Sequence, residues 1–73
     1  MNTILINREP VELYKILKFE GLASSGGEAK LLIDQGEVQV NGAVELQRRK
    51  KIRSGDRLTL GEAEFQIEFD PAS

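Results

Sequence analysis

The sequence contains no cysteine, no histidine and no tryptophan, and aromatic residues make up only 5% of its 73 positions. Without cysteine the chain can form neither a disulfide framework nor a thiolate metal site. Without histidine it lacks the commonest metal ligand and a frequent acid–base group. No Ser–Lys or carboxylate pair has a spacing that specifies a catalytic site. We therefore expect no enzymatic activity, no metal site and no cofactor.

Long apolar segments are also missing. The apolar part of the first seven residues is too short for a secretory signal. No apolar run approaches the roughly 20 residues of a membrane span. The hydrophobic fraction of 40% and the charged fraction of 30% are typical of a soluble globular domain. We expect residues 1–73 to form one cytoplasmic, monomeric domain without membrane contact.

Positive charge is concentrated in one part of an otherwise acidic chain, which has 10 basic and 12 acidic residues. Residues 48–57, here called the basic segment, contain six of the basic residues and one acid, Asp56, and carry a net +5. A concentrated positive patch on an acidic protein selects an anionic partner at one place. The alternative is a solvated loop with no partner, which is the usual role of a charge run.

The first half of the chain predicts a strand and then a helix. A short strand is expected over residues 3–6, and Pro10 suits the first turn of the following helix, where its missing N–H has no cost. Gly21 is expected to end this helix, because glycine adopts the left-handed C′ conformation easily. The spacing i, i+3, i+4 indicates one buried helix face, formed by Leu13, Ile16 and Leu17.

A second helix is predicted after a short turn and is expected to end at Gly36. Ser25 and Glu28 have the Ser-x-x-Glu spacing of a capping box, in which each residue satisfies a backbone N–H of the other. The i, i+3, i+4 spacing recurs at Ala29, Leu32 and Ile33.

The start of the second helix is also a candidate phosphate site. A helix N-terminus directs free N–H groups and partial positive charge outward. Gly26 and Gly27, next to Ser25, would let an anion approach the backbone, and Lys30 lies about one turn further on. The alternative is an ordinary helix cap in which small residues allow close packing.

The second half of the chain predicts strands. Val38 and Val40 alternate with polar residues, and Asn41-Gly42 indicates a hairpin. A two-residue loop would place Val44 on the face opposite Val38, so we favour a three-residue loop that puts both valines on the core face. Further alternation predicts strands at Leu58 and Leu60 and at Phe65, Ile67 and Phe69, before a frayed tail at 71–73.

This order of elements predicts an α+β fold with two packed helices on one face of a small antiparallel sheet of three to five strands. Phe65 and Phe69 are expected in the core, and Phe19 in the core or at a helix end. Tyr14 is expected to be partly buried. These positions leave no aromatic platform for single-stranded nucleic acid, so binding through an RNA or DNA backbone fits better.

One long pattern connects the second helix to the later strands. It reads Ser25-x-x-x-Ala29-x-x-Leu32-Ile33-x-x-Gly36-x-Val38-x-Val40-Asn41-Gly42, followed by Gly55-Asp56-x-Leu58. Over residues 12–60 the chain resembles the RNA-binding domain named after small-subunit ribosomal protein S-four, and in particular its small stand-alone bacterial members. The resemblance implies an αL motif, with RNA lying across the helical pair and the basic segment.

The resemblance also implies a function, which is non-catalytic binding of structured RNA, ribosomal or transfer RNA, with ribosomal proteins as further partners. Many family members have arginine where this chain has Glu12 and Gly26, so the remaining cations must supply most of the attraction. The residues expected to bind RNA are Lys18, Ser25, Gly26, Gly27, Lys30, Arg48, Arg49, Lys50, Lys51 and Arg53.

Two other functions stay open. The protein could be an adaptor on the ribosome, in which the basic segment docks an acidic protein or the acidic face meets a basic one. The Val-x-Val-Asn-Gly and Gly-Asp-x-Leu patterns also resemble ubiquitin-like sulfur carriers. Those proteins need a C-terminal Gly-Gly, whereas this chain ends in Pro71-Ala72-Ser73.

Overall fold

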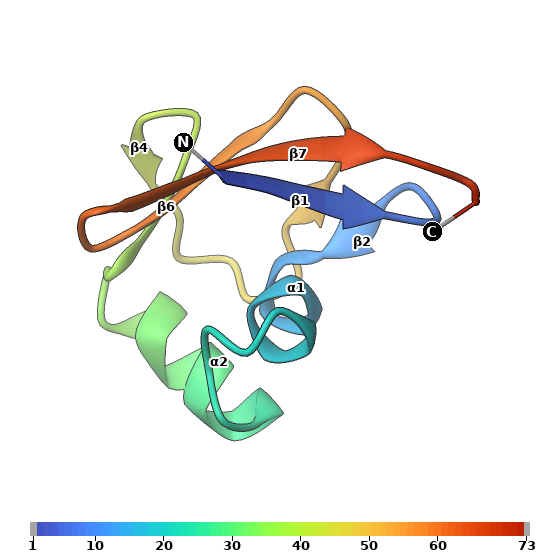
Figure 1. Ribbon diagram of the computed structural model, residues 1–73. Coiled ribbons are helices and arrows are strands. Elements are labelled where there is room, and N and C mark those ends of the chain that lie inside the picture. Colours follow the sequence, from blue (N-terminus) through green and yellow to red (C-terminus); the bar gives the residue numbers. More distant parts are fainter. Residues whose placement is uncertain (1, 73) are drawn as a thin grey trace.

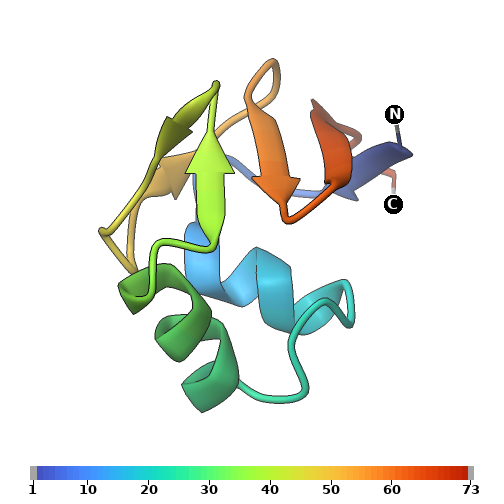
Figure 2. The same cartoon turned by 90° about the vertical axis from the view of Figure 1, so that its left-hand side faces the viewer.

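The computed structural model describes residues 2–72, which form a twisted five-stranded sheet, a two-stranded sheet and two helices (Figure 1). Both helices lie on the same side of the larger sheet (Figure 2). The predicted α+β class and packed helical pair are therefore confirmed. In chain order the elements are β1 Asn2–Ile6, β2 Val11–Glu12, α1 Leu13–Phe19, α2 Gly26–Asp34, β3 Val38–Val40, β4 Ala43–Val44, β5 Lys51–Ile52, β6 Arg57–Leu60 and β7 Ala63–Phe69.

The larger sheet has the strand order β1-β7-β6-β3-β4 and is mixed. β1 runs parallel to β7, with Ile4 opposite Ile67, whereas the other three pairs are antiparallel. The parallel β1–β7 pair departs from the expected antiparallel sheet for a simple reason. Hairpin turns impose antiparallel pairing on consecutive strands, but both helices separate β1 from the hairpins that follow.

The core lies between the helices and the inner face of the sheet. The predicted helix stripes are confirmed, with Leu32 partly rather than fully buried. β7 contributes Phe65 and Ile67 by strict alternation, as predicted. The buried apolar residues are Ile4, Ile6, Leu13, Ile16, Leu17, Ala23, Ala29, Ile33, Val38, Val40, Ile52, Leu58, Phe65 and Ile67.

Two of the three phenylalanines lie outside this core. Phe19 is 65% exposed and Phe69 is 42% exposed, so the expectation that Phe69 is a core residue was wrong. Each is the last residue of its element, and Phe19 also falls outside the i, i+3, i+4 stripe of α1. A side chain at the end of a helix or strand is flanked by other residues of that element on one side only. The tail begins after Phe69 with an exposed turn at residues 71–72, and Ser73 lies outside the described residues.

The β3–β4 hairpin has a two-residue loop, so the favoured three-residue loop was wrong. Val40 pairs with Ala43 and Gln39 with Val44. Asn41 and Gly42 both have positive φ, 54° and 86°, and such tight turns match the twist of the flanking strands. Val44 consequently faces outward and is 54% exposed, which an edge strand tolerates because no helix covers it.

The starts of the two helices also differ in detail from the expectation. α1 begins at Leu13, and Pro10 lies in the bend before β2 instead of the first helical turn, because Val11–Glu12 pairs with β5. At α2 the Glu28 N–H donates to Ser25 Oγ at 3.1 Å, as a capping box requires. The Glu28 carboxylate, however, accepts from the N–H and hydroxyl of Ser24. Gly21 and Gly36 end the helices as predicted, with φ of 74° and 76°.

Candidate nucleic-acid interface

The two helices bring three of the predicted site residues, Lys18, Gly26 and Lys30, together with Tyr14 along the seam between them. Tyr14 and Lys18 lie one turn apart on α1, and Gly26 and Lys30 one turn apart on α2, so each pair shares a helix face. The Lys30 ammonium is 4.9 Å from the centre of the Tyr14 ring. A Cβ added to Gly26 would lie 4.0 Å from Cδ of Lys18. Lys18, Lys30 and the start of α2 therefore form one surface.

The start of α2 has the geometry that an anion can approach. Ser25 is the N-cap, and Gly26 and Gly27 are the first two helical residues. N–H groups in a first helical turn have no partner within the helix, and glycines leave them uncovered by side chains. The Glu28 carboxylate is held on Ser24.

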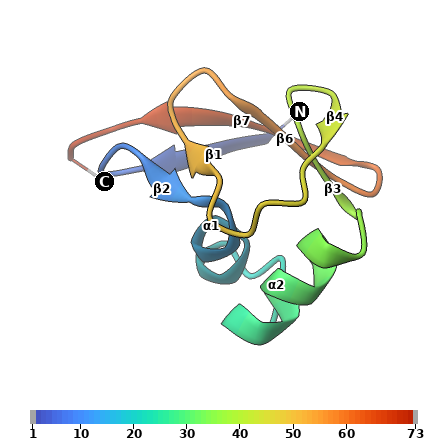
Figure 3. The same ribbon diagram turned by 180° about the vertical axis from the view of Figure 1, so that it is seen from behind.

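The basic segment is docked against α1 and contains a strand of its own (Figure 3). The Leu13 N–H donates to the Lys50 carbonyl at 2.9 Å, and the Tyr14 N–H donates to the Arg48 carbonyl at 3.1 Å. These carbonyls take the place of a side-chain cap, which Glu12 does not provide. Sequence reasoning missed β5, because two residues are too few to show a period. The segment is a fixed edge of the helical pair and not a free loop.

Arg48 connects the basic segment to α2 through its side chain. Its Nε donates to Asp34 Oδ1 at 2.9 Å, and its Nη2 donates to Asp34 Oδ2. The hydrogen bond and charge of Arg48 lower the pKa of Asp34, and Asp34 in turn raises the pKa of Arg48. Sequence reasoning did not identify Asp34, because no local pattern links residues on different elements.

Glu12 holds two further cations beside the basic segment. Its carboxylate is 3.2 Å from the Lys15 ammonium and 3.9 Å from Nε of Arg49. The hydrogen bond from Lys15 lowers the pKa of Glu12, with partial burial opposing it and the charges of Lys15, Arg49 and Lys51 reinforcing it. The acid therefore offsets part of the positive charge at this edge.

The remaining cations of the predicted site are Lys50, Lys51 and Arg53. Lys50 is partly exposed, whereas Lys51 and Arg53 are exposed. Within residues 2–72 no salt bridge joins any of the three to an acid. Asp56, the one acid of the basic segment, accepts from the Arg53 N–H and from Nδ2 of Asn41. It therefore orders the turn and forms no salt bridge with any of these three side chains.

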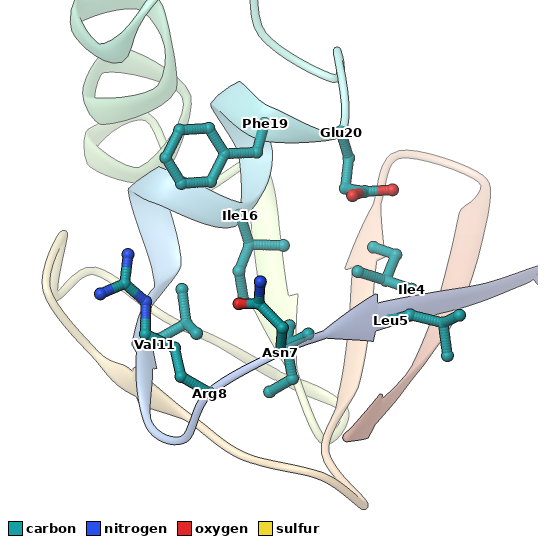
Figure 4. A pocket seen from close by; sticks show the side chains of 9 residues that line it. Ile4, Leu5, Asn7, Arg8, Val11, Ile16, Phe19 and Glu20 are labelled. Carbon is teal, nitrogen blue, oxygen red and sulfur yellow. The ribbon is translucent and has the colours of Figure 1, made fainter. Parts of the chain in front are cut away.

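A different surface lies between β1 and the opposite side of α1 (Figure 4). It is a groove of about 280 Å³ whose apolar wall includes Leu5, Ile16 and Phe19, with Arg8 and Glu20 among its polar residues. None of the predicted RNA-binding residues lines it. Within residues 2–72 there is no cluster of acids that could hold a metal ion, and no helix is long and apolar enough to cross a membrane.

Comparison with known proteins identifies the family to which this architecture belongs. The sequence profile of the S4 domain matches residues 4–68. The chain belongs to the S4 domain family. The predicted resemblance is therefore confirmed, over more of the chain than the residues 12–60 on which it was first seen.

Relatives of this S4 domain have nearly the same length. An Escherichia coli K12 protein named "Putative RNA-binding protein YbcJ" is 40% identical over 68 residues, covering 92% of this chain and 97% of YbcJ. A Bacillus subtilis protein named "Probable ribosome maturation protein RlbA" is 34% identical over 67 residues, covering 90% and 94%. The solution structure of E. coli YbcJ, described as revealing an αL motif involved in RNA binding, superposes with a TM-score of 0.70. It is 39% identical and covers 93% of this chain and 87% of that one.

Proposed function

We propose that this S4 domain is a non-catalytic, monomeric cytoplasmic protein that binds structured RNA through backbone phosphates. The observation that carries the proposal is the joining of three features in one surface. The α2 N-terminus lies against Lys18. Lys30 lies against the ring of Tyr14, and the backbone N–H of Tyr14 donates to the Arg48 carbonyl of the basic segment. The basic segment is thereby hydrogen-bonded to α1. Positive groups fixed at set positions suit the regular phosphates of a folded RNA better than a flexible chain does.

Recognition of shape fits this surface better than stacking of bases. Tyr14 is partly buried and its ring is in contact with the Lys30 ammonium. The exposed Phe19 lines the groove beside β1, and its ring centre lies 6.0 Å from the Lys18 ammonium. It is therefore a single ring at the margin of the proposed surface and not a row of rings on which successive bases could stack. Without an aromatic platform, sequence-tolerant binding of single strands is disfavoured, and structured ribosomal or transfer RNA is the proposed ligand. The name of the B. subtilis relative supports the ribosomal alternative.

Binding measurements with single-charge variants test this function. We would titrate the protein against purified ribosomal RNA fragments, unmodified tRNA and a DNA duplex of equal length. Lys18→Gln and Lys51→Gln each remove one charge from the proposed surface and are expected to weaken RNA binding by about two- to fivefold. Lys18→Arg and Lys51→Arg keep the charge at the same positions and should leave the affinity close to that of the wild type.

Crosslinking in cells with sequencing of the bound RNA would identify the ligand. Recovery of ribosomal or transfer RNA supports the proposal. If Lys18→Gln and Lys51→Gln bind RNA as tightly as the wild type, the assigned surface is wrong. Recovery of a protein partner without any RNA would favour an adaptor role instead.

A further inference from the structure

Arg48 is held in a way that leaves part of its guanidinium group available. A guanidinium has five N–H donors in a fixed plane. The pair with Asp34 uses the Nε–H and one N–H of Nη2, so the Nη1 side and the outer N–H of Nη2 stay unused by it. The Arg48 side chain is 51% exposed and that of Asp34 is 39% exposed. The unused end therefore has access to solvent.

The backbone of Arg48 is fixed as well. Its carbonyl accepts the Tyr14 N–H at the start of α1. Asp34 is the last residue of α2, one turn beyond Lys30, which in turn lies one turn beyond Gly26. Residues four apart lie on one helix face, so Asp34 continues the stripe formed by Gly26 and Lys30. Arg48 is thus attached to α1 through its backbone and to α2 through its side chain, at the end of the seam.

We propose that Asp34 is a positioning residue for RNA binding, which holds Arg48 side-on so that the free end of the guanidinium donates to a phosphate. The inference rests on the proposed RNA-binding function and adds a residue to it. Arginine suits this arrangement because its planar fork can hold a carboxylate along one edge and a phosphate along another. A lysine, with a single ammonium group, cannot.

The positioning role and simple charge repulsion predict opposite effects on RNA affinity when Asp34 is removed. Removing a negative charge near bound RNA ordinarily strengthens binding, because less repulsion acts on the phosphates. If Asp34 orders Arg48, its removal leaves a long side chain that must be immobilised when RNA binds. That entropic loss corresponds to a weakening of about two- to tenfold.

The test compares Asp34→Asn with a matched neutral substitution nearby. Glu37 is exposed and follows α2 by three residues, so Glu37→Gln removes an equal charge without touching Arg48. With the ribosomal RNA fragment that the wild type binds most tightly, Asp34→Asn should weaken binding about two- to tenfold. Glu37→Gln should leave it unchanged or slightly tighter. Tightening by Asp34→Asn, or equal behaviour of the two variants, would overturn the positioning role.

Two further measurements separate positioning from a loss of folding. Arg48→Lys keeps the charge but cannot make the fork, so it should weaken binding, and adding Asp34→Asn to it should have little further effect. In the free protein, ¹⁵N relaxation at Nε should show an ordered Arg48 side chain in the wild type and a mobile one in Asp34→Asn. A mobile Arg48 in the wild type contradicts the proposal.

The outcomes also separate this inference from the proposed function. If the wild-type protein binds none of the RNAs, the proposed function and the role of Asp34 are both refuted. If the wild-type protein binds RNA and Asp34→Asn binds it equally well, only the role of Asp34 is refuted.

Discussion

At the scale of single residues, Glu12 and Asp34 hold their arginine partners in different ways. Asp34 makes two hydrogen bonds to Arg48 and thereby fixes its plane. Glu12 reaches Arg49 only at 3.9 Å, and the Arg49 side chain is 73% exposed. A single long contact to an exposed side chain contributes little order. On the proposed surface, Glu12 would therefore act mainly as a charge that repels RNA phosphates.

Replacing Glu12 by glutamine is expected to strengthen RNA binding by about two- to threefold, since the repulsion is removed without freeing a positioned arginine. Fluorescence anisotropy with the preferred RNA fragment would measure the change. Glu20→Gln, which alters the same charge at the groove beside β1, is the control and should not tighten binding. Weaker binding by Glu12→Gln would indicate that Lys15 and Arg49 need the carboxylate for their placement.

The same two acids predict a pH dependence of stability. The pKa values of Asp34 and Glu12 are lowered in the folded protein, chiefly by hydrogen bonds from Arg48 and Lys15. A group whose pKa is lowered by folding stabilises the protein above its unfolded value, and this contribution is lost as pH falls through the folded value. The melting temperature should therefore fall as the solution is acidified below the ordinary carboxyl range.

Thermal unfolding followed by circular dichroism between neutral and strongly acidic pH would measure this loss. Asp34→Asn lacks one of the two titrating acids and should show a shallower decline than the wild type. High salt should reduce the difference, because both side chains are partly exposed and screened. Parallel curves for the two proteins would show that the pair with Arg48 does not contribute to stability.

At the scale of the elements, the β3–β4 hairpin carries a defined conformational constraint. Gly42 has a φ of 86°, and a Cβ added there would meet nothing within 4 Å. Gly42→Ala should therefore destabilise the protein through the backbone alone, by about 1–2 kcal/mol. Urea unfolding would measure this value.

Gly27→Ala is the matched control for the hairpin. Gly27 lies in the first turn of α2 without a positive φ, and its added Cβ would make only an ordinary contact at 3.8 Å with Ser25 Oγ. This substitution should leave stability unchanged or raise it by about 0.4–1 kcal/mol. Equal losses from both substitutions would mean that the left-handed turn is not what makes Gly42 necessary.

How far each element could be predicted depends on the range of the interactions that define it. The helices and β7 were predictable because one buried face leaves a local period, as in Leu13, Ile16 and Leu17. The exposure of Val44 was not, because it depends on whether another element covers β4. The Asp34–Arg48 pair and the parallel β1–β7 contact join distant positions, and no local pattern encodes either of them. The candidate site was accordingly predicted as a set of cations but not as a fixed geometry.

At the scale of the whole molecule, the cations of the proposed site gather on one side, although acids lie on both sides and Arg57, opposite Gln66, lies on the outer face of the sheet. The basic segment and helix seam carry the cations of the proposed site. On the outer face of the sheet, Glu64 and Glu68 are exposed and alternate with the buried Phe65 and Ile67 of β7. Such a distribution orients an approaching polyanion towards one side of the protein.

This gathering of cations on one side predicts a marked dependence of RNA binding on salt. Contact with about four to six phosphates gives a slope of log K against log salt of roughly −3 to −5. Neutralising Arg48, Arg49, Lys50 and Lys51 together should flatten that slope and weaken binding, measured by titrations between about 50 and 200 mM KCl. Glu64→Gln with Glu68→Gln should leave the slope unchanged. An unaltered slope in the fourfold variant would exclude the basic segment from contact with RNA.

The parallel pairing of β1 with β7 also affects how the fold is reached. During synthesis its partner in the sheet, β7, which places Ile67 opposite Ile4, is made only after the seven elements that lie between the two strands. Contacts between distant parts of a chain close large loops, and they slow folding because the loss of chain entropy precedes the gain from contact. While β1 waits for this partner, the apolar side chains of Ile4 and Ile6 lack their final cover. Completion of the sheet is therefore a late step in folding.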